Sequence, residues 1–166
     1  MPKLFIPKSF EAPRTLSTEH FYFRVLDETV AQLDYEAVMS SREQLIGIFG
    51  PGSTWPEMDM TFEENIASLK VHQAEFDSQK AFAYSVFDAS KSNCLGSVYI
   101  DPSRSHNYDC EVYFWIRNDC SALEQELFNT ISSWLQKAWP FSRIAFPGRS
   151  ISWEAWCDEL TTKSRG

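Results

Sequence analysis

The feature that most constrains the fold is a run of three strand-like segments, at 81–88, 94–101 and 109–117. Each combines β-branched and aromatic residues and is bounded by turn residues, which is typical of strands. The segment 121–138 then has the clearest helical stripe of apolar residues, and Pro140 ends it. A short strand is expected at 142–146. A helix that connects two strands of one sheet favours a parallel pair, whereas short turns favour antiparallel pairs.

The elements on either side complete an α+β pattern. Residues 20–26 alternate like a strand, and a helix of about a dozen residues is expected from Asp27, with Val30, Leu33, Ala37 and Val38 on its apolar side. Two capping boxes, Thr61–Glu64 and Ser121–Glu124, predict helix starts. A short helix is expected from Trp153. The sequence predicts a mixed, mostly antiparallel sheet flanked by helices, in the order β-α-α-β-β-β-α-β-α. We expect one domain over 1–166, with 1–18 as an N-terminal arm.

Composition excludes several classes of protein. The chain has 166 residues and a net charge of −8, which argues against a nucleic-acid surface. Its six glycines cannot form a phosphate-binding loop or a dinucleotide fingerprint, and the spacing of cysteines and histidines predicts no metal site and no disulfide framework. No apolar run is long enough to cross a membrane, and the N-terminus does not look like a signal peptide, so we expect a cytoplasmic protein.

Three segments carry a family resemblance. They are Phe21–Leu26, Leu95–Ile100 and Glu111–Ile116. In this order they resemble the first, third and fourth strands of the GNAT superfamily of N-acetyltransferases, over roughly residues 19–147. The resemblance implies an acyl-CoA-dependent N-acetyltransferase that acts on an amine of a small molecule or a protein. The alternative is a catalytically silent GNAT-like module that binds a ligand or a protein.

The resemblance also implies where acetyl-CoA would bind. Pantetheine would lie beside the strand at Trp115 and Ile116, and the diphosphate would lie at the start of the following helix, where unpaired N–H groups attract anions. The nearest match to the family's diphosphate loop is Arg117-Asn118-Asp119-Cys120-Ser121-Ala122. Cys120 replaces the usual middle glycine, and Asp119 adds a negative charge. A thiol near a helix start also has a lowered pKa, although an ordinary thiol is the simpler interpretation of Cys120.

Candidate catalytic residues follow from the same strand. Glu111 is the candidate base for the amine proton, and Tyr113 shares its strand face. The alternative for Glu111 is a solvated carboxylate at a sheet edge. No tyrosine follows Tyr113, so the tyrosine that often protonates the leaving thiolate in this superfamily has no counterpart.

The glycine- and proline-rich loop around 46–56 holds Phe49 and Trp55, which are expected either to bind substrate or to plug the core. Residues 27–77 hold eleven acidic and two basic side chains. This segment either favours a cationic amine acceptor or keeps two helices soluble. Only 20 residues follow Phe146, fewer than the family's last helix and hairpin need. The sheet is therefore either reduced or completed by a partner, for which a homodimer is one arrangement.

Overall fold

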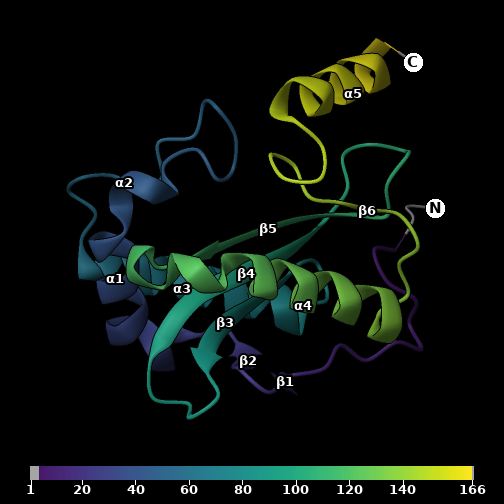
Figure 1. The fold of residues 1–166 in the computed structure, drawn as a ribbon. Helices are drawn as coiled ribbons and strands as arrows, with labels where there is room; N and C mark the ends of the chain where they lie inside the picture. The colour runs from purple at the N-terminus through teal and green to yellow at the C-terminus, as the bar shows by residue number, and fades with distance from the viewer. Residues whose placement is uncertain (1–3, 166) are drawn as a thin grey trace.

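A computed structural model describes residues 4–165 and contains one six-stranded sheet in the order β1-β2-β3-β4-β5-β6 (Figure 1). The strands are β1 Thr15–Ser17, β2 Phe21–Val25, β3 Phe82–Asp88, β4 Cys94–Pro102, β5 Cys110–Ile116 and β6 Ile144–Ala145. Each neighbouring pair is antiparallel except β5 and β6, which are parallel. The predicted mixed, mostly antiparallel sheet is confirmed.

Helices cover both faces of this sheet. The helical elements are η1 Glu28–Val30, α1 Ala31–Ser40, α2 Arg42–Leu45, α3 Phe62–Asp77, η2 Asn118–Leu123, α4 Glu124–Ala138 and α5 Trp153–Arg165. Figure 1 shows α4 lying across one face of the sheet and α5 standing apart from the sheet. The other face is covered by α1 and α3, which contact β4 and β3 respectively. Because both faces are covered, the central strands are buried along nearly their whole length.

The face of the sheet under α4, called here the α4 face, is closed by apolar and aromatic side chains. Phe23 and Tyr84 meet Trp134 of α4 edge to face, with ring centroids 5.5 and 5.1 Å apart. The N-terminal arm adds Ile6, which is 4% exposed. The arm also contains β1, a strand that the sequence analysis did not predict. It pairs with β2 because Thr15–Ser17 lies in register with Tyr22–Arg24.

The opposite face, called the α1/α3 face, is also buried but more polar. Its apolar residues include Leu69 of α3, Tyr99 of β4 and Trp115 of β5. Six of the seven buried polar residues belong to this face or to the loops beside it: Asp34, Ser41, Asn65, Ser85, Ser97 and Glu111.

Two expectations about helices are wrong in detail. Leu33 was expected on the buried side of the first helix, but it is 40% exposed, whereas Asp34 is 3% exposed and faces the protein interior. The second capping box does not form. The chain enters a 3₁₀ turn at Asn118, α4 begins at Glu124, and Leu123 precedes it without a side-chain cap. The first box does form, since Thr61 Oγ1 accepts from the Glu64 N–H at 3.1 Å.

The described segment after β6 is helical. Within residues 4–165, only α5 and no strand follows β6. This helix packs on the loop between β4 and β5, where Trp156 meets Tyr108 at 5.7 Å and Glu159 accepts hydrogen bonds from Ser105 and Asn107. No described helix is long and apolar enough to span a membrane.

Candidate functional site

The site is a gap in the sheet between β5 and β6. The two strands pair at only two positions, Cys110 with Ile144 and Glu111 with Ala145. Beyond Glu111, β5 continues for five residues to Ile116 without a partner on this side. After Phe146 the chain turns through Pro147 and Gly148, whose φ of 82° requires a residue without a side chain. The backbone groups of β5 that face the gap are therefore available to other partners.

Arg149 fills this gap. Its Nη2 donates to the Phe114 carbonyl at 2.9 Å, and its guanidinium lies 3.7 Å from the centre of the Phe114 ring. Its Nη1 pairs with Glu124, at the start of α4, at 3.1 Å. One side chain thus occupies one backbone carbonyl on the unpaired edge of β5 and connects that edge to α4.

Arg149 lines two neighbouring surface hollows. One, of about 490 Å³, is lined by Ser121, Ala122 and Phe128 together with Arg149. The other, of about 290 Å³, is lined by Ile46 and Trp153 together with Arg149. Each is large enough for part of an extended ligand.

The predicted cofactor segment, 115–122, is divided between two environments. Ser121 and Ala122 line the larger hollow. Arg117 instead pairs with Asp119 at 2.7 Å and with Glu36 at 3.5 Å. The Asn118 N–H donates to Ser41 Oγ at 2.9 Å. Trp115 and Ile116 are buried, and the Trp115 indole N–H donates to the Tyr99 hydroxyl at 3.0 Å. The structure therefore brings only the end of the segment to a hollow.

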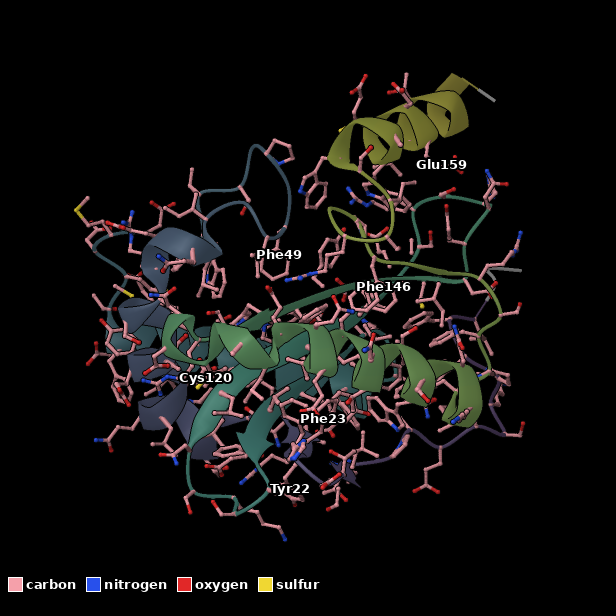
Figure 2. The ribbon with its side chains drawn as sticks, in the orientation of Figure 1. Tyr22, Phe23, Phe49, Cys120, Phe146 and Glu159 are labelled. Carbon is pink, nitrogen blue, oxygen red and sulfur yellow. The ribbon has the colours of Figure 1, made fainter. Side chains whose placement is uncertain are left out.

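Cys120 is not an activated thiol. Partial burial and the nearby Asp119 raise its pKa, because both disfavour the thiolate. Its position, labelled in Figure 2, is at the 3₁₀ turn that leads into α4. The expectation of a lowered pKa is wrong, because burial of the thiol and then the neighbouring Asp119 carboxylate both disfavour the thiolate.

Four polar side chains cluster at the closed end of the gap. Glu111 is 4% exposed, so the alternative of a solvated edge carboxylate is wrong. It accepts hydrogen bonds from the Arg104 N–H and Nε, both at 3.0 Å, and from the Tyr113 hydroxyl at 2.9 Å. Asp101 lies opposite Glu111 on β4. Burial and the Glu111 charge raise the pKa of Asp101 to about 6.

Phe49 and Trp55 close the α1/α3 face. The Phe49 ring lies 5.1 Å from Tyr99, 5.3 Å from Tyr113 and 5.5 Å from Trp55. Figure 2 shows Phe49 where its loop approaches β5. Trp153 also stacks on Tyr113, with ring centroids 6.3 Å apart. Phe49 and Trp55 therefore plug the core, and they also line a small cavity against Tyr99.

Sequence reasoning missed three residues of this region. Arg149 follows the Pro-Gly turn after the last strand, and that turn was the available signal. Asp101 lies at the end of a predicted strand and could have been found from its antiparallel register with Glu111. Arg104 lies in a loop, where no pattern indicated its contact with Glu111.

The fold is that of the GNAT acetyltransferases, as similar solved structures show. The chain is similar to the ribosomal-protein-S5-alanine acetyltransferase from Vibrio fischeri, with a TM-score of 0.62, 19% identity and coverage of 90% of this chain and 81% of that one. It is also similar to a putative ribosomal-protein-serine acetyltransferase from Vibrio cholerae, with a TM-score of 0.59, 13% identity and coverage of 74% and 67%. The microcin C7 self-immunity acetyltransferase in complex with acetyl-CoA and AMP gives a TM-score of 0.58, 12% identity and coverage of 72% and 63%. No protein-family model and no curated protein sequence matches the chain significantly.

Proposed function

We propose that this protein is an acyl-CoA-dependent N-acyltransferase that acts on an amine of a small molecule or a protein. The observation that carries the proposal is the gap between β5 and β6, which opens beyond Glu111 and has a hollow on each side of Arg149. The acetyltransferases that share the fold support it, and one of them is described in complex with acetyl-CoA. An acyl-CoA supplies the activated thioester.

The residues around the gap fit such a ligand once Arg149 changes partner. Backbone groups of β5 near Phe114 would hold the pantetheine amides, and Arg149 would hold the diphosphate beside Ser121 and Ala122. Arg149 now pairs with Glu124, so releasing it requires that a stronger anion replace this carboxylate. Asp119 opposes a diphosphate less than its charge suggests, because Arg117 already pairs with it.

The proton of the acceptor amine would go to Asp101. Asp101, Glu111 and Ala145 lie side by side on β4, β5 and β6, in the last row before the gap opens. Glu111 already accepts from Arg104 and Tyr113, which leaves it less free to take a proton. Among the described side chains, none forms a hydrogen bond or ion pair with the Asp101 carboxylate. Its pKa of about 6 suits a base at neutral pH. Glu111 and Tyr113 then act as positioning residues.

Binding of acetyl-CoA tests the proposal without a known acceptor. Acetyl-CoA at about 100 times its Kd adds roughly 2.7 kcal/mol of stability, which corresponds to a rise in melting temperature of about 5 to 10 °C. Glu124→Gln should enlarge the rise, because it frees Arg149 and removes a negative charge beside the diphosphate. Glu126→Gln is the matched control, since Glu126 is on the same turn of α4 but pairs with His20.

The second candidate is a GNAT-like module without catalytic activity. The observation that favours it is the same Arg149, which closes the gap with two polar contacts and a stacked ring. If neither the wild-type protein nor Glu124→Gln responds to millimolar acetyl-CoA in thermal-shift or calorimetric titration, the enzyme proposal fails and this candidate remains.

A further inference from the structure

A separate cavity of about 160 Å³ lies between α1, α3, β4 and the loop that carries Phe49. Its lining includes Asp34, Phe49, Trp55, Ser68, His72 and Tyr99. Phe49 packs against both Tyr99 and Tyr113, so it stands between this cavity and the polar cluster around Glu111. Neither the acyl-CoA gap nor the proposed base uses this cavity.

The burial of the Asp34 carboxylate in this cavity is not explained by apolar packing. Its side chain projects from α1 into the cavity and is 3% exposed. Its Oδ2 accepts one hydrogen bond, from the amide of Asn65, at 3.0 Å. Among residues 4–161, whose side chains the structure describes, no lysine, arginine or histidine forms an ion pair with it. A buried carboxylate with a single neutral donor is costly, because a charge inside a protein needs an opposite charge or several donors.

The other ionisable groups near Asp34 leave the cavity without a positive charge. On α3, burial lowers the pKa of His72, which is therefore neutral at neutral pH, and Glu75 lies 3.7 Å from its ring. On β4, burial raises the pKa of Tyr99 and of Cys94, so both stay protonated. The lining thus combines aromatic and aliphatic side chains with neutral polar groups, and Asp34 is its one carboxylate.

We propose that this cavity binds a small organic ammonium ion, with its cationic group against Asp34 and its alkyl part against Phe49, Trp55 and Tyr99. Aromatic rings attract cations through their negatively charged faces, and they also bury alkyl groups. A volume of 160 Å³ corresponds to about five water molecules, and therefore to a ligand of about five heavy atoms. The site does not depend on acyl transfer, since binding requires no acyl-CoA.

Calorimetric titration with n-butylammonium tests the proposal, in phosphate buffer at about pH 7.5. Butan-1-ol is the neutral control, because it has the same number of heavy atoms and no charge. We expect butylammonium to bind at least about tenfold more tightly than butan-1-ol, and Asp34→Asn to remove this preference. Glu43→Gln removes one exposed carboxylate from the neighbouring helix and should leave the affinity unchanged.

A pH series on the wild-type protein tests the same site without a substitution. Between about pH 7.5 and pH 5 the affinity for butylammonium should fall about tenfold, because burial raises the pKa of Asp34 to about 6 and protonation removes the charge. Protonation of His72 would add a repelling charge only at lower pH, since its pKa is lowered. Equal affinity for butylammonium and butan-1-ol, unchanged affinity in Asp34→Asn, or no binding of butylammonium up to about 10 mM would each overturn the proposal.

Discussion

The two faces of the sheet are buried to a similar extent but are built from different residues. On the α4 face, rings of Phe23, Tyr84, Trp134 and Trp139 meet edge to face. The buried charged side chains among the described residues, Asp34 and Glu111, do not lie on this face. On the α1/α3 face, Asp34 and Glu111 are buried within the same layer as Tyr99 and Tyr113.

The difference indicates a division of roles. Apolar burial stabilises without requiring a ligand, whereas each buried carboxylate carries a desolvation cost that a protein keeps only where something offsets it. Glu111 has Arg104 and Tyr113 as partners, whereas among the described side chains Asp34 has a single one, Asn65. We therefore expect substitutions in the interior of the α4 face, away from Phe114 and Phe128 beside Arg149, to change stability alone. Substitutions on the α1/α3 face should change chemistry, binding or pH dependence.

The largest expected effect is a loss of stability caused by a substitution on the α4 face. Phe23 is fully buried against Trp134, so Phe23→Ala should lower the free energy of unfolding by about 3 to 5 kcal/mol through lost burial and a cavity. Urea denaturation measures this loss, and acetyl-CoA should still stabilise the folded variant. Loss of acetyl-CoA binding by the folded variant would contradict the division between the faces.

The next effect concerns Asp101 on the α1/α3 face. If Asp101 is the base, the rate of acylation should rise through about pH 6 as the carboxylate ionises, and Asp101→Asn should lower kcat by about 10²-fold or more. Glu111→Gln should move the rise to lower pH, because the Glu111 charge helps to raise the Asp101 pKa. The readout is the pH–rate profile with an acceptor found by screening amines. An unchanged profile in Asp101→Asn would exclude this residue as the base.

The smallest expected effect is that of Asp34→Asn. This substitution should raise the free energy of unfolding, whereas Phe23→Ala should lower it. The pKa of Asp34 is about 6 when folded and about 3.8 when unfolded, so its ionisation costs stability as the pH rises through this window. Asp34→Asn should remove the cost and stabilise the protein by up to about 3 kcal/mol above pH 6, with little gain below about pH 4. Chemical denaturation at several pH values measures the difference. A loss of stability at neutral pH would mean that Asp34 is better paired than its contacts indicate.

Local sequence patterns determined most of the elements. The run of strands, the helix stopped by Pro140 and the capping box at Thr61 depend on neighbours within a few residues, and all three are present in the structure. The parallel pair of β5 and β6 also followed from the sequence, because a helix that connects two strands of one sheet favours it. The resemblance in strand order then predicted the GNAT fold.

The site depended on contacts between distant parts of the chain. Arg149 reaches Phe114 across 35 residues of sequence, and Asn65 meets Asp34 across 31 residues. Asp34 does lie three or four residues from Val30, Ala31, Ala37 and Val38, at the centre of the buried stripe, but its charge made exposure the natural expectation. The sequence by itself determined which segments become strands and helices, since propensity and periodicity are local. Only the tertiary structure decided which charges are buried, paired or left for a ligand, because desolvation and ion pairing depend on what packs around each side chain.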